Sequence, residues 1–114
     1  GDVNREASLL ISLVAHAEHK DAADAAEIAF NAGITAAGAT ALKFVPRENL
    51  KLSELDGAVD KLAQLKPLLK PRIIKACAAV IMHDGAATTR GHELLRTISS
   101  CLGSPMPPLP APGN

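Results

Sequence analysis

Four acidic residues are the part of this sequence best suited to binding chemistry. Glu18 and Glu27 are nine positions apart, as are Asp84 and Glu93, and each pair straddles an expected turn between helices. Two such turns side by side would place carboxylates, and histidines such as His16, around one divalent cation, because several such ions accept mixed oxygen and nitrogen ligands. In the simpler interpretation, which the sequence favours, these acids only interact with the positive ends of helices.

Catalytic motifs are absent from the sequence. It contains no HExxH zinc-protease motif, no GxSxG, no GxxxxGK[ST] and no GxGxxG. Cys77 and Cys101 lack a basic partner on the same expected helical face, which a reactive thiolate needs. We therefore expect no enzymatic activity in this chain, and we expect both cysteines to be buried free thiols.

The composition favours helices and excludes some partners. Hydrophobic residues make up 47% of the 114 positions but aromatic residues only 2%, so a core of alanine and leucine in close-packed helices is expected. The formal net charge is zero, which predicts no binding to nucleic acid or to an anionic membrane. No apolar run approaches the roughly 20 residues of a membrane span, so we expect no direct membrane insertion and see no signal peptide.

Hydrophobic periodicity predicts an all-α protein of five antiparallel or orthogonal helices. The expected single domain covers residues 1–103 and a proline-rich extended tail covers 104–114. The expected helices are 4–19, 22–32 with a continuation toward Gly38, 53–65, 68–83 and 89–102, and residues 38–52 form a connecting loop.

Capping signals set the expected helix ends. The predicted N-caps are Asn4, Asp21, Ser53 and Thr88. The predicted helix terminators are Gly85 and Gly103, with Gly33 as an earlier stop for the second helix.

The proline-rich tail is a second candidate for interaction. Its residues are suited to an extended polyproline conformation, which partner proteins often recognise. A frayed terminus is the alternative, and the sequence favours it. The candidate ligand residues are Pro105, Met106, Pro107, Pro108 and Leu109.

Residues 66–109 resemble the C-terminal helical domain of bacterial HtpX-type membrane zinc peptidases (peptidase family M forty-eight). The same pattern of residues is also similar to the tellurite-resistance (TerB-like) helical domains, in which an Asp-Gly pair precedes a glutamate on the next helix. One departure is Gly91, which stands where the capping box would have an acid. The matching residues are Ala76-Cys77-Ala78-Ala79, Asp84-Gly85, Glu93-Leu94-Leu95-Arg96, Ile98, Leu102 and Pro105-Met106-Pro107-Pro108-Leu109.

The resemblance implies an accessory role for the chain. The catalytic HExxH site and its zinc would lie elsewhere in the parent peptidase, and this part would lie on the cytoplasmic side, attached to an inner-membrane protein. The TerB-like likeness implies metal binding at Asp84 and Glu93 alone.

We therefore expect a non-catalytic accessory or regulatory domain of a membrane zinc peptidase. Its expected partners are the parent peptidase domain, its protein substrates or another copy of the chain. Two alternatives remain open at this stage, which are a TerB-like module that binds or senses divalent metal, and a helical adaptor unrelated to proteases.

Overall fold

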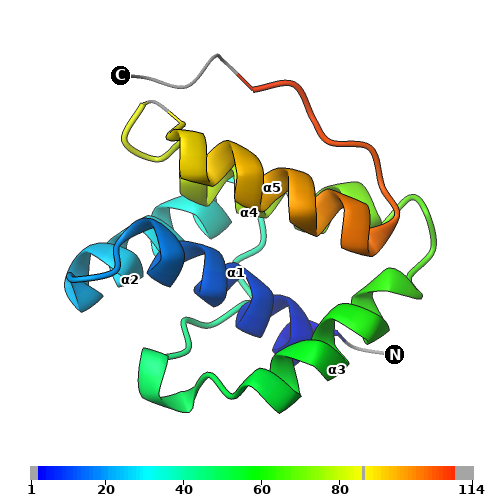
Figure 1. Ribbon diagram of the computed structural model, residues 1–114, viewed down its shortest axis with the longest axis horizontal. Coiled ribbons are helices and arrows are strands. Elements are labelled where there is room, and N and C mark those ends of the chain that lie inside the picture. The colour runs from blue at the N-terminus through cyan, green and yellow to red at the C-terminus, as the bar shows by residue number, and fades with distance from the viewer. Residues whose placement is uncertain (1–2, 86, 110–114) are drawn as a thin grey trace.

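The computed structural model describes residues 3–85 and 87–109. Within these ranges the chain forms five α-helices, one 3-10 turn and no strand, so the predicted all-α bundle of five helices is confirmed (Figure 1). None of the helices in these ranges is long and apolar enough to cross a membrane. The helices are α1 (Asn4–Glu18), α2 (Ala23–Ala36), α3 (Leu52–Ala63), α4 (Lys70–Ile81) and α5 (Thr89–Leu102), and the turn is Arg47–Asn49.

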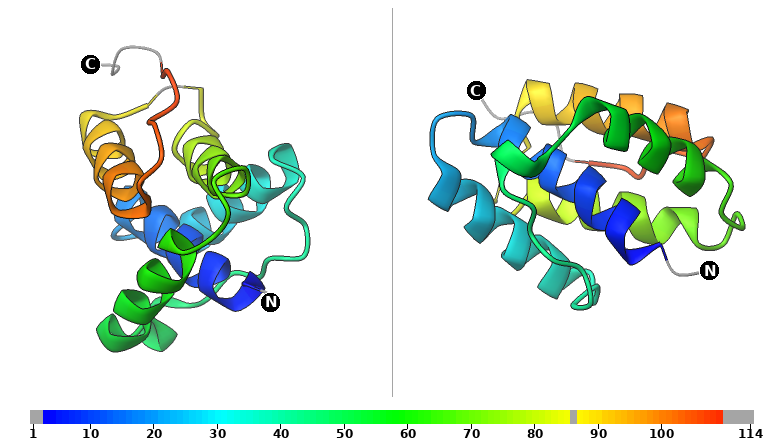
Figure 2. Two further views of the ribbon diagram at one scale, coloured as in Figure 1. Left: turned by 90° about the vertical axis from the view of Figure 1, so that its right-hand side faces the viewer. Right: turned by 90° about the horizontal axis from the view of Figure 1, so that it is seen from below.

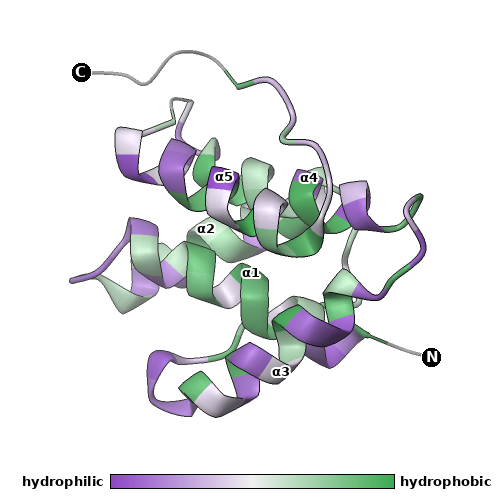
Figure 3. Ribbon diagram, turned by 45° about the vertical axis from the view of Figure 1, so that its right-hand side comes forward, coloured by the Kyte–Doolittle hydropathy of each residue, from purple (hydrophilic) through white to green (hydrophobic). Residues whose placement is uncertain are grey.

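Helix α1 lies in the middle of the bundle and contacts the four other helices (Figure 1; Figure 2). Its sequence is apolar on most sides, which is typical of a helix surrounded by protein. Leu10, Ile11 and Val14 are at most 2% exposed. Figure 3 shows this hydrophobic helix at the centre, whereas α3 carries hydrophilic residues on its outer side. The core is therefore built around α1.

Close contact between α2 and α4 explains why the second helix continues past Gly33. A Cβ atom at Gly33 would lie 2.7 Å from the backbone nitrogen of Val80, so only glycine permits this approach. The helix instead ends before Gly38, whose φ of +72° is left-handed. Gly57 in α3 has no such role, because nothing lies within 4 Å of the position its Cβ would take.

The capping predictions at the two ends of α5 are confirmed. Thr88 caps α5, and its Oγ1 accepts a hydrogen bond from the backbone N–H of Gly91 at 2.8 Å. Gly103 directly follows α5 and has the predicted left-handed conformation, with a φ of +67°. Gly85 is also left-handed, with a φ of +98°, but it does not terminate α4, which ends at Ile81 with Met82 as its C-cap. The N–H of Gly85 instead bonds to the carbonyl of Met82 at 2.9 Å, so this glycine serves the turn that follows the helix.

The other three predicted N-caps are wrong. Val3, Ala22 and Lys51 flank the starts of α1, α2 and α3, and none of them caps its helix through a side chain. In α3 the N–H of Leu55 already bonds to the carbonyl of Lys51 at 3.0 Å, and Leu55 is buried, so burial draws the helix start upstream of the capping-box serine. The residues predicted as caps were Asn4, Asp21 and Ser53.

One cysteine prediction is also wrong. Cys77 is fully buried in α4, as expected, but Cys101 is exposed in the last turn of α5. Ile98 and Leu102 take the inward positions of that turn, which leaves Cys101 on the outer face.

The described part of the tail lies against the bundle. Residues 104–109 contain no helix or strand and run back from the end of α5 toward its start (Figure 1; Figure 2). Met106 and Leu109 are partly buried and pack against the main core cluster, whereas Pro105 and Pro108 are exposed. Residues 110–114 of the predicted tail lie outside the described residues.

Candidate contact sites

The turn after α1 and the turn before α5 lie side by side. The rings of His19 and His83 meet edge to face with centroids 5.7 Å apart. The hydroxyl of Thr88 donates to the carboxylate of Glu18, with Oγ1 3.1 Å from Oε2. The two turns whose acids were considered as metal ligands are therefore neighbours.

Glu18 supports a helix start in this neighbourhood. Thr88 accepts from the N–H of Gly91 and donates to Glu18, so one hydroxyl links the first turn of α5 to a carboxylate of α1. A negative charge near the start of a helix interacts favourably with the helix dipole. Glu18 thus supplies, from another helix, the acid that the sequence of α5 lacks at Gly91.

Arg90 completes a reciprocal arrangement. Its Nη1 donates to the carbonyl of Ala17 at 3.4 Å, in the last turn of α1, where a cation is favourable. Gly91 is required because a Cβ there would lie 2.6 Å from Ile81 Cγ2 and 3.0 Å from Glu18 Oε1. The end of α1 and the start of α5 therefore complement each other's charge.

The other predicted metal ligands are placed separately. Asp84 and Glu27 are exposed, and Glu93 pairs with Arg96 on its own helix at 3.7 Å. Across residues 3–85 and 87–109, no group of three or more His, Cys, Asp or Glu side chains is arranged to hold a metal ion. The geometry accordingly offers a structural role for Glu18 and no metal cluster in the described part of the chain.

A polar stripe on α1 holds the connection between α2 and α3. Ser8 Oγ accepts from the backbone N–H of Lys43 at 3.0 Å, and Ser12 Oγ accepts from that of Val45 at 2.9 Å. His16 Nε2 lies 2.9 Å from the carbonyl of Val45. Because a carbonyl only accepts, Nε2 carries the hydrogen. A segment without helix or strand is thus anchored along one helix face.

Sequence reasoning missed this role and treated His16 only as a possible ligand. The signal was available, since Ser8, Ser12 and His16 recur every four residues in a helix that is otherwise apolar. Buried polar groups on such a face need partners, and an extended backbone supplies them. Aromatic contact adds to the anchor, because the His16 and Phe44 rings lie 5.0 Å apart.

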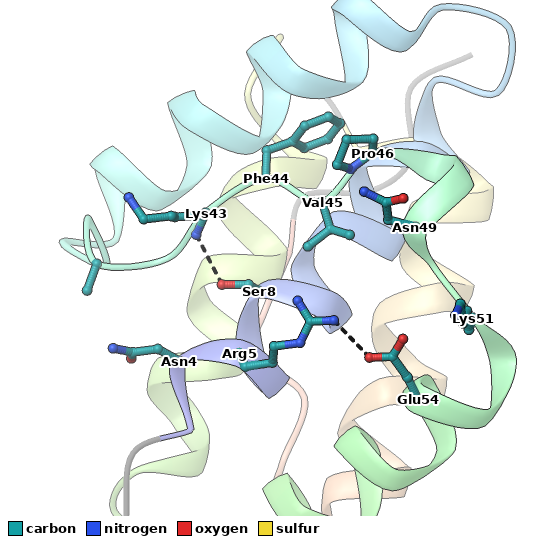
Figure 4. Close-up of a pocket in the computed structure, with 11 residues that line it drawn as sticks. Asn4, Arg5, Ser8, Lys43, Phe44, Val45, Pro46, Asn49, Lys51 and Glu54 are labelled. Carbon is teal, nitrogen blue, oxygen red and sulfur yellow. Dashed lines mark hydrogen bonds and ion pairs between the residues drawn. The ribbon is translucent and has the colours of Figure 1, made fainter.

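The anchored segment forms one wall of an open cleft of about 560 Å³ between α1 and α3 (Figure 4). Arg5 and Glu54 form an ion pair across it at 2.8 Å. Lys43 and Lys51 also line the cleft, and neither has an ion-pair partner among the described residues. The charged lining therefore has two cations that no carboxylate neutralises.

The two cysteines differ in exposure and in the state of their thiols. Burial raises the pKa of the Cys77 thiol to about 12, so it is fully protonated near neutral pH. Cys101 is exposed on α5, and the two thiols form no disulfide.

Comparison with known proteins identifies no family for this chain. No family model matches it, and no curated protein or solved structure is significantly similar to it.

Proposed function

We propose that this chain is a non-catalytic accessory domain that makes protein contacts for a membrane-bound zinc peptidase. We further propose that the cleft between α1 and α3 receives an extended acidic segment of the peptidase or of its substrate. The observation that carries the contact role is the cleft itself, where Lys43 and Lys51 face solvent without a carboxylate partner among the described residues.

The shape of the cleft suits a peptide segment. It is open to solvent and is walled by α1, the extended residues 43–46 and the start of α3. Enclosed pockets of similar volume bury most of a small ligand, but an open cleft leaves its occupant exposed along its length. An extended chain can lie in such a cleft and present carboxylates to both lysines.

The charge of the cleft selects for acidic partners. The Arg5–Glu54 ion pair is internally neutral, so the two lysines determine the net charge of the lining. Complementary charge accelerates association and disfavours partners of like charge. A segment rich in glutamate or aspartate therefore fits better than a basic or neutral one.

The peptidase part of the proposal is supported by the sequence resemblance. Within the matching residues, Leu95, Ile98, Leu102, Met106 and Leu109 belong to one packed cluster. Sequencing the coding region upstream of Gly1 tests this part. An upstream HExxH motif with membrane-spanning segments is expected, and their absence would remove the peptidase assignment.

The contact role is tested by fluorescence anisotropy with a labelled glutamate-rich peptide. We expect saturable binding by the chain, and no binding of a lysine-rich peptide of equal length. The double substitution Lys43→Glu with Lys51→Glu should weaken binding at least about tenfold, because it reverses both free charges.

Lys20→Glu is the matched control, since Lys20 is exposed in the turn after α1 and does not line the cleft. It should leave the affinity nearly unchanged. Equal weakening by the control would mean that only overall charge matters and would contradict a defined site. Failure of the acidic peptide to bind would contradict the contact role.

A further inference from the structure

Two leucines protrude from the connection between α3 and α4. Leu68 is 88% exposed and Leu69 is 39% exposed. The connection is a defined turn, because Leu69 N–H bonds to the carbonyl of Lys66 at 2.9 Å and Pro67 and Pro71 restrict the backbone on either side. In Figure 1 it lies at one edge of the bundle, between the end of α3 and the start of α4. The leucines are thus held outward at a fixed tip.

Basic residues flank this tip in the sequence, although the whole chain is neutral. Residues 61–83 contain five basic residues and no acidic one, so the rest of the chain holds seven basic and twelve acidic residues. Lys61 pairs with Glu6 at 3.6 Å. Lys66, Lys70 and Arg72 have no ion-pair partner among the described residues. The zero net charge therefore conceals a strongly basic end.

Other exposed hydrophobic residues have acidic residues nearby in the sequence. Ile28 is 61% exposed and follows Glu27, and Leu52 is 82% exposed in a segment that also contains Glu54 and Asp56. Single exposed apolar residues are ordinary on a protein surface. Leu52 follows one unpaired cation, Lys51, but the leucine tip differs because it joins two adjacent exposed leucines with three unpaired cations and no acidic residue.

We propose that this tip, defined as Lys66–Arg72, docks on the surface of an anionic membrane. Leu68 and Leu69 enter the headgroup layer, where they leave water, and the neighbouring cations contact lipid phosphates. This is the pairing of interactions that holds proteins on membrane surfaces without spanning them, since apolar burial and electrostatic attraction each contribute. The expectation of no membrane contact relied on net charge, which does not describe this end of the molecule.

The proposed docking leaves the cleft accessible. The cleft is lined by residues at the start of α3, including Lys51 and Glu54, whereas the tip follows the end of that helix. Twelve helical residues separate the two ends by about 18 Å. Membrane contact and occupation of the cleft are therefore independent, and each is tested without the other.

A tryptophan reporter tests whether the leucine tip enters the membrane. The chain has no tryptophan, so Leu68→Trp creates a single fluorophore on the tip. Vesicles of mixed phosphatidylcholine and phosphatidylglycerol should shift its emission to the blue, and vesicles of phosphatidylcholine alone should not. Leu52→Trp is the matched control, being similarly exposed but outside the basic end, and it should show no shift. Equal shifts at both positions would overturn the proposal.

Flotation of the unmodified chain with the same vesicles gives a second readout. Leu68→Asn should lower the partition coefficient for anionic vesicles about tenfold, as loss of one buried leucine predicts, and Leu52→Asn should not. Raising salt from about 0.1 M to about 1 M shortens the screening length from about 10 Å to about 3 Å and should release the protein. No flotation, or equal flotation with uncharged vesicles, would overturn the proposal. Crosslinking of the tip to a protein in the absence of vesicle binding would replace it with a protein contact.

Discussion

Two regions at helix ends differ in whether their side chains have partners. At the closed joint, defined as Glu18, Thr88, Arg90 and Gly91, the polar groups at the facing ends of α1 and α5 bond to each other. At the leucine tip, Lys66–Arg72, apolar side chains and cations are left without a partner in the described chain.

The difference separates residues that stabilise from residues that are available for contact. Among the acids that suggested metal chemistry, Glu18 already serves the start of a helix. The tip carried no motif, yet it has the exposed leucine and the free cations. A charged or unusual residue type therefore identifies a site only after its partners are known.

Thiol labelling should give the largest contrast between the two regions. Cys77 lies one turn before Ile81, which contacts the closed joint, whereas Cys101 is exposed near Gly103, beside Lys70 of the tip. At pH 8, Cys77 should react with iodoacetamide at least about a thousandfold more slowly, because burial and its pKa of about 12 keep the thiolate scarce. Mass spectrometry of timed digests measures both rates. Comparable rates would mean that α4 opens readily.

Substitution at the closed joint should cost the most stability. Gly91→Ala places a Cβ 2.6 Å from Ile81 Cγ2, so it should lower the free energy of unfolding by about 2–3 kcal/mol. Gly57→Ala is the matched control in another helix, where the space is open, and should raise it by about 0.5 kcal/mol. Urea denaturation measures both. Similar effects at the two glycines would show that close packing at the joint is not decisive.

Removing the cap hydroxyl should have a smaller effect. Thr88→Ala should destabilise by about 1 kcal/mol, because α5 loses its cap and Glu18 loses its donor. A double-mutant cycle with Glu18→Gln isolates the contact between the two side chains, and we expect a coupling of about 0.5 kcal/mol. Asp84→Asn, at an exposed acid of the same connection, is the control and should change little. Zero coupling would remove Glu18 from the cap.

Substitution at the leucine tip should have the smallest effect on folding. Leu68→Asn should change the free energy of unfolding by less than about 0.5 kcal/mol, since Leu68 is 88% exposed and buries little in the folded chain. The same variant should weaken vesicle binding strongly, which separates contact from stability. A loss of 2 kcal/mol or more, at about the scale of a core leucine, would mean that the tip belongs to the core.

Much of the fold could be predicted from local sequence. Apolar periodicity placed the five helices, and Thr88 and Gly103 marked the two ends of α5 correctly, because a cap or a left-handed glycine acts within a few residues. The contact between Gly33 and Val80 could not be predicted in this way. These residues are 47 positions apart in the sequence. A glycine can either end a helix or permit a close helix crossing, and the local sequence does not distinguish the two roles.

The candidate sites also combine features set by local sequence with features set by tertiary packing. Residue types alone determined that the chain is helical, that it lacks the common catalytic motifs and that residues 61–83 hold five basic residues and no acidic one. Only the tertiary structure decided that Glu18 supports the start of α5, that Ser8 and Ser12 anchor residues 43–45, and that Leu68 stays exposed. Helix propensity and capping depend on residues that are close in the sequence, so short segments are enough to predict them. The partner of a charge or a polar group depends on which distant segment packs beside it, and packing settles that only when the whole core forms.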